Sequence, residues 1–212
     1  MKAVKTISIT GLFVCLLTMH CPLNAQRPAR PGDFDFYVFT LSWSPQFCAE
    51  HQEKAECHVR GNNFVVHGLW PQWKNGTWPQ TCSSQSGPSN PRDESDVMAD
   101  VSLVEHEWAK HGTCSGLSVA DYFQLIRTVR SSISTPDIFL HFSQSAQMAP
   151  AAVKAAFLAK DPQLSEPDIV VGCANNTLVQ VQICITKDGT PTACSGLRDC
   201  RAKRISVLPV LR

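Results

Sequence analysis

The sequence predicts an α+β fold in which helices pack on a mainly antiparallel central sheet, stapled by disulfides into a single domain. Segments rich in aromatic and β-branched residues lie near both ends of the chain, and segments with apolar residues at helical spacing lie between them. Eight of the ten cysteines lie beyond the N-terminal segment, an even number that is typical of exported, disulfide-bonded domains. A chain of this length suits one domain with a substantial core.

Residues 1–25 have the pattern of a secretory signal peptide. Two lysines precede an apolar run, Ile7 to Leu17, and Leu23-Asn24-Ala25 fits a cleavage site. The apolar run is too short for a comfortable membrane span. A lipoprotein anchor at Cys21 is disfavoured because a bulky residue precedes it. We therefore expect a secreted or periplasmic domain of residues 26–212 that has no membrane attachment.

Two strands are predicted in the first third of the chain. Phe34 to Ser42 is rich in aromatic and β-branched residues and predicts a central strand, which ends in a turn at Trp43 to Cys48. Phe64 to Pro71 is an apolar run that predicts a buried strand, with His67 at its end before Gly and Pro break it. The polar segment Glu50 to Asn63 between them predicts a loop.

Helices are predicted in the middle of the chain and strands near its end. Ser95 can cap the first helix, Ser118 opens the second, and Pro150 begins a third, Ala-rich helix. The final section then predicts paired strands, a turn and a last strand, at Ile169 to Ala174, Leu178 to Thr186, Asp188-Gly189 and Ile205 to Val210.

The first helix carries an unusual group of ionisable residues. When Leu103 to Cys114 is read as an α-helix, four such side chains share an arc of about 140°, in the angular order His106, Lys110, Glu107 and His111. An apolar stripe beside this arc can seat the helix in a core, so that the polar arc faces a cleft; it consists of Val101, Val104 and Trp108. Gly112 suits the left-handed position that ends a helix.

Three kinds of polar helix face fit these residues. A solvated surface is the ordinary fate of a charge run. A zinc site is suggested by His106-Glu107, which opens the pattern H-E-x-x-H, but Lys110 occupies the place of the second histidine. His106 and His111 are five residues apart, a poor spacing on an α-helix for sharing one ion. We therefore expect no metal and no cofactor, and interpret the group as an acid–base site with a fixed cation.

The strand that contains His67 supplies a companion to this helix. A lone histidine after a strand is more often structural than catalytic, but here it stands in Val66-His67-Gly68-Leu69-Trp70-Pro71, and the helix reads His106-Glu107-Trp108-Ala109-Lys110-His111-Gly112-Thr113-Cys114. Together these stretches closely resemble the two active-site signatures of the ribonuclease T2 family, secreted enzymes that use two histidines. Their order and separation also fit, and the resemblance extends from about Phe34 to near the C-terminus.

The resemblance implies an endoribonuclease that acts on single-stranded RNA, leaves DNA uncut, needs no metal and works as a monomer. In the family, the residue matching His111 is usually taken as the base and the one matching His67 as the acid, a direction that the residues alone leave open. Lys110 is placed to neutralise charge on the phosphate. Glu107 could position the phosphoryl group or an imidazole, and its carboxylate would repel phosphate unless its pKa is raised or Lys110 pairs with it.

Further residues are expected to bind the substrate. His106 can bind phosphate, and the resemblance places Gln72 and Trp78 where base contacts occur, although many relatives carry an acidic residue at the Gln72 position. Trp70 can stack on a base or can instead pack under the His67 loop. A different class of function is a catalytically silent relative that binds a partner. Loss of a histidine or of Lys110 would signal that class, and all three residues are present.

Eight cysteines allow many pairings, and the family's layout implies one of them. It pairs Cys48 with Cys57, Cys82 with Cys114, and nests Cys184–Cys194 inside Cys173–Cys200.

The charge of the chain argues against one way of binding nucleic acid. Without Lys2 and Lys5 the 19 Lys and Arg residues fall to 17, against 18 Asp and Glu residues, so the mature net charge is about −1. A broad basic surface that holds nucleic acid would make the domain strongly positive. Cleavage of RNA needs positive charge only at the scissile phosphate, which the cations of the proposed site can supply.

Overall fold

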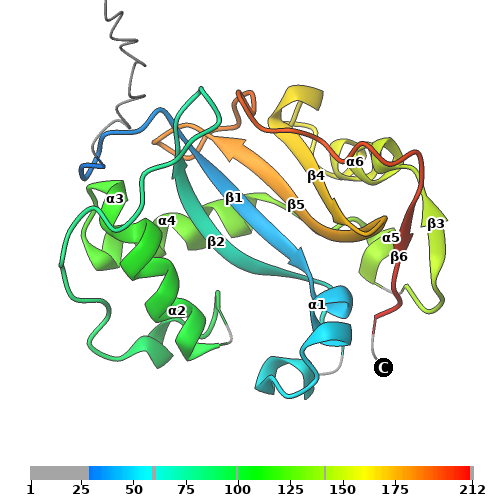
Figure 1. The fold of residues 1–212 in the computed structure, drawn as a ribbon, viewed down its shortest axis with the longest axis horizontal. Coiled ribbons are helices and arrows are strands. Elements are labelled where there is room, and N and C mark those ends of the chain that lie inside the picture. Colours follow the sequence, from blue (N-terminus) through cyan, green and yellow to red (C-terminus); the bar gives the residue numbers. More distant parts are fainter. Residues whose placement is uncertain (1–28, 59–60, 99, 141, 211–212) are drawn as a thin grey trace, which may run out of the picture.

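The computed structural model describes residues 29–58, 61–98, 100–140 and 142–210. The predicted signal peptide, residues 1–25, lies outside these ranges. The described chain confirms the α+β class, because helices pack around a sheet that is antiparallel except for one short parallel contact between β5 and β6. The strand order is β2-β1-β5-β6-β3, with β4 also paired to β5 (Figure 1).

Figure 1 shows α2 and α4 beside β2, and α6 on the other side of the molecule near β4. The strands are β1 (Phe36–Trp43), β2 (Phe64–Gln72), β3 (Ala146–Met148), β4 (Ile169–Ala174), β5 (Thr177–Ile185) and β6 (Ile205–Val207). The α-helices are α1 (Ser44–Glu50), α2 (Val101–Glu107), α3 (Thr113–Ser115), α4 (Val119–Ser132), α5 (Asp137–Leu140) and α6 (Pro150–Lys160). Shorter turns of helix are η1 (Ala55–His58), η2 (Pro91–Glu94), η3 (Trp108–Gly112) and η4 (Glu166–Asp168).

Strand β1 is central, as the sequence predicts, and pairs with β2 on one side and β5 on the other. Because side chains alternate along a strand, its two faces differ. One face joins the main core through Tyr37, Phe39, Leu41 and Trp43. The opposite face holds a small second cluster of Phe36, Val38 and Cys184. The turn predicted after β1 is wrong: Ser44–Glu50 forms α1, with Pro45 in the first helical turn, where its missing N–H costs nothing.

Strand β2 does not end at His67, as the sequence predicts, but continues to Gln72 across a β-bulge. The pairing moves from Thr40 opposite Gly68 to Leu41 opposite Val66, so His67 is the extra residue without a partner on β1. Phe64 and Val66 face the main core before the bulge, and Leu69 faces it afterwards. The change from even to odd positions is the one-residue shift that a bulge causes.

Two of the three predicted helix starts are confirmed, and the third predicted start is wrong. Ser118 caps α4 by accepting a hydrogen bond from the Asp121 amide, and α6 begins at Pro150. Ser95 caps no helix but follows the 3₁₀ turn η2. Helix α2 begins later, where the Asp100 side chain accepts from the Ser102 amide at 2.8 Å. In the described part of the chain, no helix combines the length and apolar composition needed to cross a membrane.

The helix that was read as regular contains a π-helical turn. Helix α2 passes directly into η3, whose i→i+5 hydrogen bonds accommodate one more residue in the turn, and then into α3. Gly112 lies inside this turn with right-handed backbone angles, and the residue in the left-handed region is Gly116, with φ +77°. Gly112 is required for another reason, since a Cβ there would overlap the Trp108 ring.

The structure pairs the eight cysteines in the way that the family's layout implies. The bonds are Cys48–Cys57, Cys82–Cys114, Cys173–Cys200 and Cys184–Cys194. Strands β4 and β5 form the predicted C-terminal pair, and β6 is shorter than predicted because it ends at Val207. The two nested disulfides fasten the segment after β5 to β4 and β5, which matters for the surface considered below.

Candidate active site

Alternation from the core residues Phe64 and Val66 places His67 on the opposite face of the sheet, and the β-bulge keeps Gly68 and Trp70 on that face as well. Ser42 of β1 lies on the same face, two and four residues beyond Thr40 and Val38, and its hydroxyl is hydrogen-bonded to His67 Nδ1 at 2.9 Å. The His67 side chain is 38% exposed, so its other ring nitrogen can meet a ligand from solvent. Burial lowers the pKa of His67, and the positive charges of His106 and Lys110 lower it further.

Glu107 is the most deeply buried acid in the site, with a side chain only 1% exposed. Its carboxylate lies over Gly68, where a Cβ would overlap it. Trp70 Nε1 donates a hydrogen bond to Glu107 Oε2 at 2.6 Å, and His67 Nε2 lies 3.7 Å from Oε1. Burial raises the pKa of Glu107 to about 7, against the lowering effects of the Trp70 hydrogen bond and Lys110. From the sequence, we expected a carboxyl beside phosphate to have either a raised pKa or Lys110 as a partner. The raised pKa meets the first of these conditions.

The π-turn carries His111 into the protein, where the residue is 5% exposed. Its ring lies 5.3 Å from the Trp70 ring, tilted by 31°, while the His67 ring meets Trp70 edge-on, also at 5.3 Å. Burial lowers the pKa of His111 to about 3, reinforced by Lys110, His106 and His67. The Nδ1 atom of His111 is buried without a hydrogen-bond partner among the described residues. A buried imidazole of this kind stays neutral at ordinary pH.

Lys110 and His106 add positive charge to this group from the same helical segment. Lys110 is partly exposed and His106 is exposed. Their charges lower the pKa of both His67 and His111, which places all four side chains within electrostatic range of one another. The Lys110 carbonyl accepts a hydrogen bond from the Thr81 amide at 2.8 Å, so the loop before Cys82 fixes the backbone of the turn. In the described residues, no three His, Cys, Asp or Glu side chains are grouped closely enough to hold a metal ion.

The three residues that the sequence assigned to base contacts occupy different environments. Trp70 is partly buried and packs on the Phe36 and Val38 cluster, so it takes the packing role, in addition to holding Glu107. Gln72 is only 7% exposed, which leaves little of it for a ligand. Trp78 is 52% exposed in the loop after β2 and is free to stack on a planar group.

A cavity of about 660 Å³ opens beside His67 and His106 and extends toward the start of β2. Its walls come from several elements, including Phe47 of α1, His51 just after α1, Lys54, Val65 of β2, Asp96, Leu103 of α2 and Arg130 of α4. A cavity of this size is in the range that holds small ligands. His51, whose side chain is 45% exposed, lies at the surface and also lines this wall.

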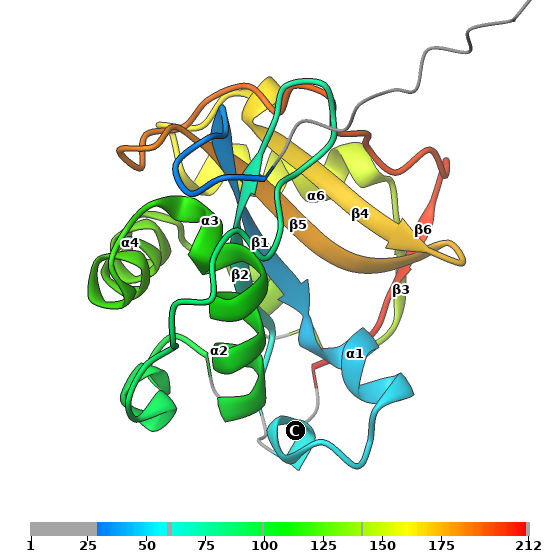
Figure 2. The ribbon, with the colours of Figure 1, turned by 60° about the vertical axis from the view of Figure 1, so that its left-hand side comes forward.

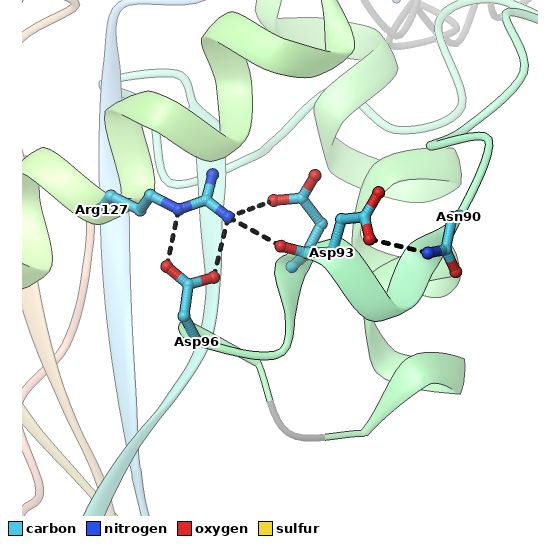
Figure 3. A network of polar contacts seen from close by, with 5 residues as sticks. Asn90, Asp93, Asp96 and Arg127 are labelled. Carbon is cyan, nitrogen blue, oxygen red and sulfur yellow. Dashed lines mark hydrogen bonds and ion pairs between the residues drawn. The ribbon is translucent and has the colours of Figure 1, made fainter.

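One wall of the cavity is held by an ion-pair network (Figure 3). Arg127 of α4 binds both carboxylate oxygens of Asp96, through Nε at 2.7 Å and Nη2 at 2.8 Å, and its Nη2 also reaches Glu94 at 2.7 Å. The side chains of Glu94 and Asp96 therefore point toward α4. The predicted helix start at Ser95, next to them, does not form. The Arg127 hydrogen bonds also lower the pKa of Asp96, which keeps it ionised.

Sequence reasoning missed Ser42 and the role of Gly68. Both depend on the register between β1 and β2, which places Ser42 beside His67 and Gly68 beneath Glu107. The alternation of core residues in β1 could have placed Ser42 on the open face. The shift of core positions across His67 could have indicated the bulge.

Comparison with known proteins fits this arrangement. Residues 34–200 match the family model described as the ribonuclease T2 family. The chain belongs to the ribonuclease T2 family. A ribonuclease of Aeromonas hydrophila is 33% identical over 169 residues, 78% of each chain. Family membership supports an RNA-cleaving activity.

Solved structures show the same fold. Ribonuclease MC1 from bitter gourd seeds superposes with a TM-score of 0.62 at 25% identity, covering 81% of this chain and 99% of that one. An RNase-related protein from Calystegia sepium gives a TM-score of 0.65 at 24% identity, covering 84% and 98%. At 24% identity, the similarity to the Calystegia sepium protein supports the fold alone.

The close approach of Glu107 to Gly68 gives a first prediction. In Gly68→Ala the new methyl group must displace the Glu107 carboxylate or the Trp70 indole, so ribonuclease activity should fall by about 10²-fold or more. Gly87→Ala is the control, because its Cβ would lie 3.2 Å from Trp108, where a small adjustment suffices. Activity and thermal unfolding are measured for both. Unchanged activity in Gly68→Ala would show that this contact does not organise the site.

The raised pKa of Glu107 gives a second prediction. Because the folded pKa of about 7 exceeds the ordinary 4.5, this group stabilises the fold fully below pH 4.5, and that stability is lost as pH rises through 7. Glu107→Gln removes the titration. Its free energy of unfolding, relative to wild type, should therefore rise between pH 4.5 and 8, by roughly 3 kcal/mol at most.

The measurement for Glu107→Gln is urea unfolding at several pH values. The histidines titrate in both proteins, so their contributions largely cancel in the difference. Glu105→Gln, which removes an exposed carboxylate from the same helix, is the control and should follow wild type. A constant difference between Glu107→Gln and wild type across this range would contradict the buried-carboxyl account.

Proposed function

We propose that this protein is an exported endoribonuclease that cleaves single-stranded RNA by intramolecular attack of the 2′-hydroxyl on the adjacent phosphorus. The observation that carries the proposal is that a partly exposed His67 and a buried His111 both contact the Trp70 ring, whose Nε1 is hydrogen-bonded to Glu107, with Lys110 close enough to lower the pKa of both histidines. The family match gives the activity class, and this geometry supports the two-histidine mechanism.

His111 is the base in this proposal. Its burial keeps the imidazole neutral, the form that can accept the 2′-hydroxyl proton. A phosphodiester anion entering the site would raise the pKa of His111 toward the working range, because nearby negative charge favours the protonated ring.

His67 is the acid that protonates the departing 5′-oxygen. Its side chain is 38% exposed, the anionic substrate favours its charged form, and the Glu107 carboxyl lies 3.7 Å from its Nε2. The proton moves from His67 to the leaving oxygen as the phosphorus–oxygen bond breaks. The Ser42 hydroxyl fixes the ring through Nδ1. Burial lowers the pKa of His67 as well as that of His111, so the bound phosphate anion has to raise the pKa of His67 before this residue can donate a proton.

Lys110 and Glu107 complete the charge balance at the phosphate. Lys110 is a fixed cation for the charge that develops on the non-bridging oxygens. Glu107, with a pKa of about 7, is partly protonated near neutral pH and can then donate a hydrogen bond to a phosphate oxygen rather than repel it. These charges do the work that a metal ion performs in other nucleases, so no metal or cofactor is needed.

The first product is a 2′,3′-cyclic phosphate. Water then opens it more slowly to a 3′-phosphate, with His67 taking the proton from water and His111 returning one to the 2′-oxygen. Two places could hold nucleosides: the cavity beside His67 and His106, and the exposed Trp78 indole in the loop after β2. The nucleosides that flank the scissile bond would occupy these places, with His106 binding phosphate.

The protein acts as a monomer, and its four disulfides suit an oxidising, secreted or periplasmic location.

The roles of the two histidines can be tested by substitution. His67→Ala and His111→Ala should each lower kcat by at least the 10²-fold order typical of lost general catalysis. His58→Ala, which removes an exposed histidine from η1, is the matched control and should keep wild-type turnover. The measurement is steady-state cleavage of a defined dinucleotide. Near-normal turnover in His67→Ala would mean that the histidine at the bulge is structural.

The chemistry itself can be tested with RNA and DNA oligonucleotides of the same sequence in excess EDTA. RNA should be cut at an undiminished rate, with early products that carry 2′,3′-cyclic phosphate ends identified by mass. DNA should survive, because it lacks the attacking hydroxyl. Loss of RNA cleavage in EDTA, or comparable cutting of DNA, would refute the mechanism. An absence of cleavage with intact binding would favour the silent relative.

A further inference from the structure

Positive charge is concentrated in the segment Arg198–Arg204, called the basic segment below. It reads Arg-Asp-Cys-Arg-Ala-Lys-Arg and holds four of the chain's 19 Lys and Arg residues but only one of its 18 Asp and Glu residues. The four basic residues are exposed. Because the rest of the mature chain carries more acids than bases, this segment is a local positive surface on a slightly acidic protein.

None of the four cations is paired with an acidic side chain in the described part of the chain. The one acid, Asp199, is used elsewhere: its Oδ2 pairs with Lys154 Nζ at 2.8 Å, and its Oδ1 accepts from the Val171 amide at 2.9 Å. Arg204 donates to a backbone carbonyl of β3. The remaining three have no acidic partner within 4 Å among the described residues; they are Arg198, Arg201 and Lys203.

The backbone that presents these cations is fixed at several points. Cys200 is bonded to Cys173, and its amide donates to the Val171 carbonyl at 2.8 Å. Just before the basic segment, Cys194 is bonded to Cys184. Just after it, the chain enters β6. A surface held in this way loses little backbone entropy when a ligand binds, which favours affinity.

The basic segment begins next to the loop after β2 that carries Trp78. Gly196 packs so closely on the backbone of Gly76, in the loop between β2 and Trp78, that a Cβ on either residue would overlap the other's backbone. Leu197 and Trp70 pack on the same apolar cluster of Phe36, Val38 and Cys184. Figures 1 and 2 show the orange-to-red chain running from beside this loop toward β6. A strand of RNA that leaves the catalytic centre past Trp70 and Trp78 would therefore reach Arg198.

We propose that Arg198, Arg201 and Lys203 form a second RNA-binding surface, which holds backbone phosphates beyond the nucleotides at the scissile bond. This inference rests on the proposed function for the direction of the RNA strand. Guanidinium and ammonium groups bind phosphate without reading bases, so the surface strengthens binding of long RNA whatever its sequence. An anionic membrane would also attract three cations, but the continuity with the site favours the polymer that the site cleaves.

The experiment compares two triple variants of the mature, oxidised protein that change the net charge equally. Arg198→Gln/Arg201→Gln/Lys203→Gln removes the proposed surface. Arg30→Gln/Arg92→Gln/Lys160→Gln removes two arginines and one lysine from exposed positions elsewhere. Binding is measured by fluorescence anisotropy with 2′-O-methyl oligonucleotides, which cannot be cleaved, from two to sixteen nucleotides long. Cleavage of a dinucleotide and of a sixteen-nucleotide RNA is measured in parallel, and vesicles with and without anionic lipid are a further binding probe.

The basic-segment variant should bind the longest oligonucleotide about ten-fold more weakly than wild type. A plot of its log affinity against log salt concentration should also have a shallower slope, by about 2, because three phosphate contacts are lost and each contributes about 0.7 to the slope. Its cleavage of the dinucleotide should match wild type, whereas kcat/KM on the long RNA falls. The control variant should retain wild-type values for long RNA.

Three results would overturn the inference: equal binding of long RNA by wild type and the basic-segment variant, an equal loss in the control variant, or a loss confined to anionic vesicles. If wild type cleaves neither RNA but the length-dependent binding still falls only in the basic-segment variant, the proposed function fails and the RNA-binding surface stands.

Discussion

The burial of the Glu107 carboxyl against β2 is the constraint on which the rest of the site depends. A carboxyl that is 1% exposed needs hydrogen bonds or a shifted pKa to be tolerated, and here it has both. The contact with Trp70 Nε1 fixes the indole, and the indole in turn contacts both imidazoles. The same contact requires Gly68, since any side chain there would occupy the space of the carboxyl. The buried acid therefore accounts for the glycine at position 68 and for the position of the Trp70 indole, which contacts both imidazoles.

Two irregularities in the backbone bring these groups together. The β-bulge leaves both His67 and Gly68 on the face opposite the main core and returns Leu69 to that core, and the π-turn accommodates an extra residue between Glu107 and Gly112. Each costs some regular hydrogen bonding and is expected near functional sites. A regular strand and a regular helix of the same residues would offer different faces to each other. The arc of about 140° calculated for an ideal helix is therefore only an approximation to the observed group.

The fold and the site were predictable from sequence to different extents. Local signals located β1, the Ser118 cap and the helix at Pro150, because these depend on neighbouring residues. The late start of α2 was not predictable in this way, because Asp96 is held by Arg127, 31 residues along the chain. The choice of His67, Glu107, Lys110 and His111 came from motif chemistry and family resemblance. Their arrangement, and the part that Ser42 plays in it, depend on strand register and were visible only in three dimensions.

Burial, more than net charge, assigns different tasks to chemically similar groups in this protein. His67 and His111 share the same nearby cations, yet the buried His111 has a pKa of about 3 and the half-exposed His67 keeps contact with solvent. Glu107 shifts in the opposite direction because burial penalises its charged form. In the proposed mechanism, an anionic phosphate that enters this group raises the pKa of both imidazoles and pairs with Lys110, so the substrate supplies the charge that the free site lacks. On that proposal, a nearly neutral protein acts on a polyanion because its positive charge is concentrated where phosphates would lie.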